Sequence, residues 1–298
     1  MIFPWSLWFP RSPWYPSRVP LITYTTVCTS KTLLARGVYE FTFSKPAGFT
    51  FKPGQFILFN VPLIGNPGDV QTRAFSIAST PEEPDFLFIV KIIPGGRASR
   101  WFEEAVDTGT TVTFTGPFGN FTLAPEQEKN LLFLATGTGM APFRPMIMQA
   151  LKRTDDVNGA SAPAGEPPPA AAAAPSPTPR SMLLGEGEGR KSVRGGQRKI
   201  DLIFCVKTEA DLFWKDELEV MAKHHPGVHL HLTLSAPSPS WTGHRGRVQV
   251  VTPLIMMNNF SDVTLYACGN PEMTKEVKKL AVEDWGMEKK DVHVEGYI

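Results

Sequence analysis

The pattern of apolar and turn-forming residues changes near Pro125, and this change constrains the fold more than any other feature. Before Pro125, short β-rich runs are separated by proline and glycine, a pattern typical of strands joined by turns. Six short strands in succession favour a small antiparallel β-barrel. We expect these strands at Leu21–Cys28, Val38–Phe43, Phe56–Val61, Ala74–Ser79, Phe86–Ile93 and Thr111–Thr115.

After Pro125, apolar strand-like runs alternate with helical stretches, which predicts a doubly wound α/β domain with a parallel sheet. The 298 residues exceed the usual size of one core, so two domains are expected, at 21–124 and 125–298. The parallel strands are expected at Leu131–Ala135, Ile200–Val206, Val228–Leu234, Val263–Cys268 and Val292–Glu295.

Two segments fall outside this pattern. Asp155–Lys199 contains PPPAAAAAPSPTP and GEGEGRKSVRGG, so we expect a disordered insertion within the second domain. A linker between domains is disfavoured because the strand–helix alternation resumes after it. Residues 1–20 form an expected irregular arm with Trp5, Trp8 and Trp14. Those rings either pack against the folded domains or bind a membrane or a partner protein.

Composition excludes several classes of protein. The net charge of +1 is too balanced for a general nucleic-acid binder. Three separated cysteines cannot all pair and cannot supply the four ligands of a plant-type iron–sulfur cluster. No run approaches the ~20 apolar residues of a membrane span, and the N-terminus lacks a signal-peptide pattern. We expect a cytoplasmic protein without a metal site; the oligomeric state is not predicted.

The segment LFLATGTGMAPFR reads as a buried strand, a glycine turn and a helix. This arrangement directs helix N-terminal amides at an anion. Gly137 and Gly139, flanked by Thr136 and Thr138, would allow the close backbone approach of a diphosphate. Pro142 suits a first helical turn. A tight connection without a ligand is the alternative.

Two further motifs lie in the β-rich half. In RAFS, Arg73 and Phe75 share a strand face and Ser76 points to the other, so a cation and a ring could meet a phosphate and a flat heterocycle. An ordinary strand would look the same. In PGGRAS, Gly96 and Ser99 precede an apparent helix over Ser99–Val106, which predicts a second anion site or a capped turn.

A fourth motif, YACGNPEM, ends one strand and opens a helix. It leaves Cys268, Gly269 and Pro271 at the carboxyl edge of the sheet, where ligands of open α/β sheets bind. A buried thiol acting only as a small apolar residue is the alternative for Cys268.

Together these motifs resemble the ferredoxin-NADP reductase family. RAFS, PGGRAS, ATGTGMAPFR and YACGNPEM follow in that family's order and spacing, and the VEGY tail resembles its closing acid-x-tyrosine. The resemblance covers residues 21–152 and 200–298. It implies an FAD-binding barrel followed by an NAD(P)-binding domain, with FAD between them and NADH or NADPH as a diffusible co-substrate.

The resemblance also implies roles on the FAD side. Arg73 would bind the FAD diphosphate, and Ala74 beside it is among the implied cofactor-binding residues. Phe75 would lie against the isoalloxazine or ribityl part, where the family usually has tyrosine, and this change removes a phenol hydrogen bond. Gly96 and Ser99 would hold the second part of the diphosphate.

On the nicotinamide side, the loop Thr136–Pro142, Lys207, Gly269 and Pro271 would bind the nucleotide. The implied catalytic residues are Ser76 near flavin N5, Cys268 by nicotinamide C4, Glu295 close to it and Tyr297 over the outer flavin face. Ile298 follows that tyrosine, whereas plant-type reductases end on it.

The implied activity is hydride transfer from nicotinamide C4 to flavin N5, followed by electron transfer to an acceptor. A ferredoxin, flavodoxin, cytochrome, oxygenase component or small molecule would fit. Ser235-Ala236 stands where plant-type enzymes have Ser-Arg, which favours NADH unless Lys207, Arg245 or Arg247 supplies a cation. The alternatives are a non-catalytic FAD-binding electron-transfer or regulatory subunit, and a docking protein that acts through the Trp-rich arm.

Overall fold

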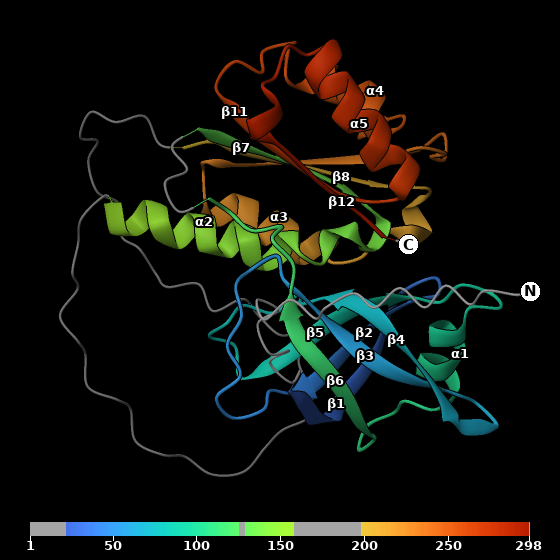
Figure 1. Cartoon of the computed structure of the whole chain (residues 1–298). Helices are drawn as coiled ribbons and strands as arrows, with labels where there is room; N and C mark the ends of the chain where they lie inside the picture. The colour runs from blue at the N-terminus through green and yellow to red at the C-terminus, as the bar shows by residue number, and fades with distance from the viewer. Residues whose placement is uncertain (1–21, 125–128, 158–197, 298) are drawn as a thin grey trace, which may run out of the picture.

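The computed structural model describes residues 22–124, 129–157 and 198–297 of the chain. They form two domains in chain order, an antiparallel sheet and a parallel sheet with helices on both faces (Figure 1). The fold class expected from the sequence is therefore confirmed. The N-terminal arm of residues 1–20 lies outside the described residues, as does most of the expected insertion.

The first domain is a six-stranded antiparallel sheet that curls on itself. Its strand order is β4-β3-β6-β1-β2-β5. The two end strands meet after Ser76, where the Ala78 amide donates to the Leu87 carbonyl at 2.8 Å. Its elements are β1 (Thr23–Ala35), β2 (Val38–Ser44), β3 (Phe56–Leu63), β4 (Asn66–Ser76), β5 (Asp85–Lys91), α1 (Arg97–Glu104) and β6 (Thr111–Phe118).

Alternating phenylalanines fill the barrel. Phe41, Phe43, Phe59, Phe88 and Phe114 are fully buried, and the Phe59 ring lies 5.1–6.2 Å from several of its neighbours. Burying one such ring contributes about 1.5–3 kcal/mol. This core fixes the inner face of β3 and β4, and so it fixes which residues of RAFS face outward.

Several strand boundaries differ from expectation, and β4 and β1 differ most. β4 begins at Asn66, eight residues before the expected Ala74, because pairing with β3 overrides the local effect of Pro67 and Gly68. Proline is tolerated there since β4 is an edge strand with a register shift. β1 continues to Ala35 because its second half pairs with β2 after its first half pairs with β6. Helix α1 begins at Arg97, not Ser99.

The second domain is a six-stranded, wholly parallel sheet in the order β10-β9-β8-β7-β11-β12. Helices α2 and α3 cover the face toward the first domain, and α4 and α5 cover the opposite face (Figure 1). The two-residue β10 was not expected. The strands are β7 (Asn130–Thr136), β8 (Ile200–Val206), β9 (Val228–Leu234), β10 (His244–Arg245), β11 (Val263–Gly269) and β12 (Val292–Gly296).

The helical segments follow the strand–helix alternation. Helix α2 continues to Val157, so the expected insertion beginning at Asp155 starts at least three residues too early. At the other end, the Lys199 carbonyl accepts from Leu131, which ties residue 199 to the sheet. The helices are η1 (Gly137–Met140), α2 (Phe143–Val157), η2 (Glu209–Asp211), α3 (Lys215–His224), α4 (Val248–Ile255), α5 (Pro271–Glu283) and η3 (Lys289–Asp291).

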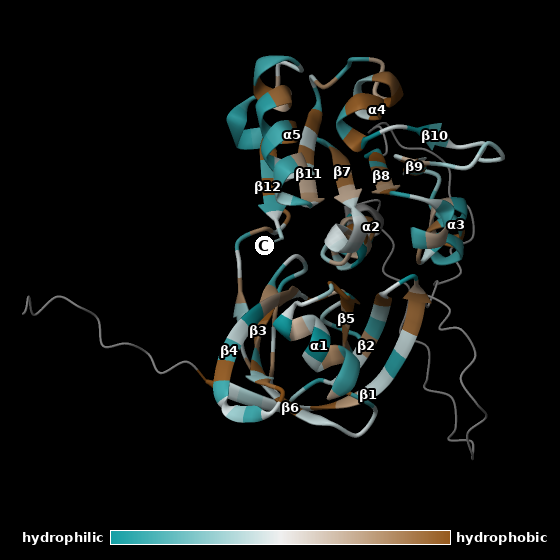
Figure 2. Cartoon of the chain, turned by 90° about the vertical axis from the view of Figure 1, so that its right-hand side faces the viewer, coloured by the Kyte–Doolittle hydropathy of each residue, from teal (hydrophilic) through white to brown (hydrophobic). Residues whose placement is uncertain are grey.

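The order of the strands places a switch point between β7 and β11, from which the sheet extends in both directions. Ligands of doubly wound sheets bind at the carboxyl ends of strands beside such a point. Strand β12 ends on the side of the first domain, beside the ends of β7 and β11 (Figure 2). No helix among the described residues is long and apolar enough to cross a membrane.

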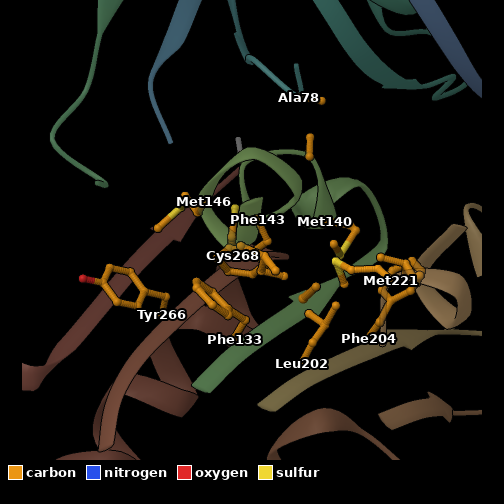
Figure 3. Close-up of a cluster of buried hydrophobic side chains, with 14 of the residues drawn as sticks. Ala78, Phe133, Met140, Phe143, Met146, Leu202, Phe204, Met221, Tyr266 and Cys268 are labelled. Carbon is orange, nitrogen blue, oxygen red and sulfur yellow. The ribbon is translucent and has the colours of Figure 1, made fainter. Parts of the chain in front are cut away.

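One hydrophobic cluster crosses the domain boundary. Ala78, Leu87 and Phe121 of the barrel side pack with residues of α2 and the parallel sheet. Figure 3 shows Ala78 above Met140 and Phe143 in this cluster. The two domains therefore share part of a core, and their relative position is set by side-chain packing.

Candidate active site between the two domains

Three neighbouring strands bring the expected catalytic residues of the second domain to one level. In the sheet register, Cys268 of β11 lies opposite both Ala135 of β7 and Glu295 of β12. The Tyr297 amide donates to the Gly269 carbonyl at 2.8 Å, which holds the tail against the end of β11. This places Cys268, Glu295 and Tyr297 beside one another at the carboxyl edge.

A chain of hydrogen bonds joins this edge to the first domain. The Tyr297 hydroxyl donates to Ser76 Oγ at 3.0 Å, and Ser76 Oγ donates to Glu295 Oε1 at 3.3 Å. Ser76 is 219 residues from Glu295 and 221 from Tyr297 in the sequence. The structure therefore brings the four residues expected to be catalytic into one cluster.

Burial controls the protonation of this cluster. It raises the pKa of the Glu295 carboxyl to about 7, although the Ser76 hydrogen bond acts in the opposite direction. Burial, followed by the nearby Glu295 charge, raises the pKa of the Cys268 thiol well above its usual range. Burial also raises the pKa of the Tyr297 phenol. At neutral pH the thiol and phenol hold their protons, and Glu295 is the group that can gain or lose one.

The glycine loop adjoins this cluster, but its two glycines do different things. Gly137 has φ +53° and open space where a Cβ would lie, which suits close approach of a ligand. A Cβ on Gly139 would instead overlap the backbone of Cys268 and Gly269. Gly139 therefore makes room for the neighbouring loop. Its contact with a diphosphate stays a prediction.

The close packing of the glycine loop against the end of β11 also involves Thr136 and the start of α5. Thr136 Oγ1 accepts from the Asn270 amide at 3.0 Å, and a Cβ on Gly269, which has φ +136°, would overlap that hydroxyl. The Asn270 side chain caps α5, and Pro271 occupies its first turn. Pro142 precedes α2, which begins at Phe143, so it lies one residue outside the expected helical turn.

On the first domain, Arg73 is exposed at the end of β4. Its guanidinium donates to Gln71 Oε1 at 2.7 Å and to the Thr72 carbonyl at 2.8 Å. Phe75 is half-buried, with its ring edge-on to Phe102 at 5.0 Å. Arg73 is thus free to face an anion from solvent, while Phe75 is anchored by the barrel.

The Gly96–Ser99 turn contains an internal hydrogen bond, and its contact with an anion stays a prediction. Ser99 Oγ accepts from the Ile93 amide at 2.9 Å, so its hydroxyl closes the turn. Gly96 precedes α1, whose first-turn amides have no intrahelical partner. Contact with an anion here would come from amides rather than from the serine hydroxyl.

One neighbouring cation, Arg97, was not among the expected binding residues. Arg97 is bound to the carboxylate and carbonyl of Asp69, and its Nε is buried without a hydrogen-bond partner among the described residues. The sequence shows an arginine in PGGRAS, but it does not show that this side chain pairs with Asp69, because that contact depends on the β3–β4 hairpin.

The outer part of the carboxyl edge carries the groups considered for dinucleotide choice. Lys207, Ala236 and Arg247 are exposed there. The Arg245 guanidinium donates to the carbonyls of Ser238, Pro239 and Trp241, so it holds its own loop together. Lys207 and Arg247 are therefore the better-placed cations.

These features fit two nucleotides on opposite sides of the Ser76–Glu295 contact. The first domain offers exposed Arg73 and the free amides of α1. The second offers the open backbone at Gly137. A flavin and a nicotinamide bound from these two sides would meet at the cluster of Ser76, Cys268, Glu295 and Tyr297.

Comparison with known proteins agrees with this geometry. The model of an oxidoreductase FAD-binding domain matches residues 25–123, and that of an oxidoreductase NAD-binding domain matches residues 133–279. Ferredoxin–NADP reductase B of Sorangium cellulosum is 31% identical over 268 residues, which are 87% of this chain and 91% of that protein.

One further relative and one solved structure are also similar to this chain. The reductase subunit of a stachydrine N-demethylase from Rhizobium meliloti is 24% identical over 277 residues, and the match covers 91% of this chain but only 65% of that protein. The crystal structure of a cytochrome P450 reductase from Amycolatopsis has a TM-score of 0.73 at 22% identity, covering 93% of this chain and 70% of that one. With both domains matched in order, the chain belongs to the ferredoxin-NADP reductase family and is an FAD-dependent NAD(P)H oxidoreductase.

Proposed function

We propose that the cluster of Ser76, Cys268, Glu295 and Tyr297 is the place where hydride passes from nicotinamide to flavin. The observation that carries this proposal is the hydrogen-bonded chain from Tyr297 through Ser76 to Glu295, which spans both domains. Residues so far apart in sequence meet only where the two nucleotide-binding domains meet. Bound FAD supplies the acceptance of a hydride and the release of single electrons.

The residues of the cluster have distinct proposed tasks. The Ser76 hydroxyl would present a proton toward a bound flavin, and Glu295, with a pKa of about 7, would accept or return a proton through that hydroxyl. Cys268 remains a protonated, fully buried thiol that shapes the nicotinamide side. Tyr297 would cover the face of a bound flavin and give way to nicotinamide.

The binding residues divide between the domains in the same way. We assign FAD to the 21–124 domain and the pyridine nucleotide to the 125–298 domain. The FAD side comprises Arg73, Ala74, Phe75, Gly96 and Ser99. The nucleotide side comprises Thr136, Gly137, Thr138, Gly139, Pro142, Lys207, Gly269 and Pro271.

We propose that NADH is the preferred dinucleotide. Ala236 is exposed at the end of β9, so the carboxyl edge carries no arginine at this position to fork onto a 2′-phosphate. Two exposed cations could still bind a 2′-phosphate: Lys207 through its ammonium group and Arg247 through two guanidinium nitrogens. The ratio of kcat/KM for NADH to that for NADPH measures this preference directly.

We further propose that electrons leave to a separate protein. The reductase of stachydrine N-demethylase and ferredoxin–NADP reductase B bear names that point to protein acceptors. A cytoplasmic location is proposed because Cys28, Cys205 and Cys268 are buried free thiols, as in reducing compartments.

One spectroscopic experiment tests the proposal. The purified protein should show a flavin absorbance spectrum, release FAD on denaturation and bleach under anaerobic NADH. Bleaching should be slowed in Ser76→Ala and Glu295→Gln while FAD content is unchanged. A flavin that is bound but not reduced by either dinucleotide would instead support the non-catalytic electron-transfer subunit.

A further inference from the structure

One buried arginine joins the two domains next to the active site. Arg144, the second residue of α2, donates from its two terminal nitrogens to the two carboxylate oxygens of Glu83 at 2.9 and 3.0 Å. Its Nη1 also donates to the Ala78 carbonyl at 3.1 Å. Glu83 and Ala78 belong to the first domain, so a single guanidinium makes three hydrogen bonds across the boundary.

The same side chain is held from its own domain. Arg144 Nε donates to Glu217 Oε1 of α3 at 3.1 Å. The guanidinium lies 5.9 Å from the Trp214 ring, and Trp214 Nε1 donates to Glu40 of β2 at 2.9 Å. Trp214 has a left-handed backbone, φ +55°, which a bulky residue adopts only where its surroundings enforce it. The contact is thus fixed on both sides.

Arg144 is buried, whereas another ion pair between the same two segments is not. The Arg144 side chain is 10% exposed. Lys152, also on α2, pairs with Glu82 at 3.0 Å, but the two side chains are 53% and 64% exposed. An exposed pair contributes little, while a buried forked pair fixes geometry and leaves an uncompensated charge when one partner is removed.

The position of Arg144 connects it to the reaction. It lies in the first turn of α2, directly after the loop Thr136–Pro142 and Phe143, and its acceptor Ala78 lies two residues after Ser76. A shift of this contact would move the nucleotide loop relative to Ser76. Hydride transfer is sensitive to such shifts, because a displacement of about 1 Å can cost about 100-fold in rate.

We propose that Arg144 is a positioning residue for hydride transfer: its forked bond to Glu83 and its bond to the Ala78 carbonyl set the distance between the nicotinamide-binding and flavin-binding domains. This inference rests on the proposed function. It adds that the placement of the domains depends on a charged contact outside the cluster of Ser76, Cys268, Glu295 and Tyr297.

The test compares Arg144→Met, Arg144→Lys and Glu83→Gln with Lys152→Met in the FAD-loaded protein. Anaerobic rapid mixing gives the rate constant of flavin reduction at saturating NADH and the NADH dissociation constant. In Arg144→Met the rate constant should fall about 10- to 100-fold, with the dissociation constant changed by less than about threefold. Arg144→Lys keeps the positive charge but cannot donate two parallel hydrogen bonds to Glu83, so its rate constant should lie between those of Arg144→Met and the wild type. Lys152→Met should match the wild type.

A second readout is independent of turnover. Amide hydrogen exchange in peptides covering 78–83 and 214–217 should speed up in Arg144→Met and Glu83→Gln, and not in Lys152→Met. If Arg144→Met does not fold, Glu83→Gln keeps the shape of the partner and should show the same loss of rate.

Two outcomes overturn the inference. One is a wild-type rate constant of flavin reduction in folded Arg144→Met or Glu83→Gln. The other is a loss confined to FAD content or nucleotide affinity. A wild-type protein whose flavin is not reduced would contradict the proposed function instead, and the exchange measurement would still report whether Arg144 holds the domains together.

Discussion

Replacing Glu295 by glutamine should change how the stability of the protein depends on pH. Glutamine keeps the size of the side chain and can still accept the Ser76 hydrogen bond, but it cannot ionise. In the folded protein the pKa of Glu295 is raised from 4.5 to about 7 by burial. Folding therefore favours the neutral form of this carboxyl.

The sign and the size of the effect follow from that shift. The stabilisation of the neutral form is full below about pH 4.5 and is lost as the pH rises through about 7. One pKa unit corresponds to about 1.4 kcal/mol, so the upper limit is about 3 kcal/mol. Because Glu295 keeps partial contact with solvent, we expect roughly half of this limit.

The assay is the midpoint of urea unfolding of the FAD-saturated protein between about pH 5 and about pH 8.5. The wild-type midpoint should fall relative to that of Glu295→Gln as the pH rises, and the difference should level off above about pH 7. Replacing exposed Glu103 by glutamine serves as a control for removal of a carboxylate. Equal pH dependence in the wild type and Glu295→Gln, or a difference that grows toward acid, would refute the assigned pKa.

Four other substitutions test the site. Cys268→Ser should slow anaerobic flavin reduction with unchanged FAD content, since the thiol is fully buried beside Glu295 and Tyr297, whereas Tyr297→Ser should tighten binding of oxidised nicotinamide nucleotide in a titration. Gly139→Ala should lower the free energy of unfolding by about 1–3 kcal/mol, because its Cβ would overlap the Cys268 backbone. The thermal unfolding midpoint should fall accordingly, and an unchanged midpoint would contradict the close contact between the two loops. Ala236→Arg should raise kcat/KM for NADPH relative to NADH by about 10-fold or more, since a charged hydrogen bond contributes about 1.5–3 kcal/mol, and an unchanged ratio would show that the 2′-phosphate binds elsewhere.

The sequence determined the elements whose signals are local. Apolar periodicity identified eleven of the twelve strands among the described residues, all but β10, because side-chain alternation and runs of β-branched residues act over a few neighbours. The glycine loop and the RAFS strand were found from short motifs in their local context, and the VEGY tail from its resemblance to the family's closing acid-x-tyrosine. Local signals failed at β4, where pairing with β3 overrode Pro67 and Gly68.

Motif order also determined which residues to consider for the site. It named Ser76, Cys268, Glu295 and Tyr297, and the structure brings them together. It could not show the raised pKa of Glu295, because that shift comes from desolvation by two domains that meet only after folding. Nor could it show that Gly139 serves the neighbouring loop.

The contact between the domains was decided by tertiary structure alone. Arg144 and Glu83 are 61 residues apart, and no periodicity or motif relates them. Charged residues are common on surfaces, so their pattern in a sequence does not distinguish an exposed pair such as Lys152–Glu82 from a buried fork. That distinction depends on which side chains water can reach, and packing of α2 against the barrel removes water from Arg144 but leaves it at Lys152.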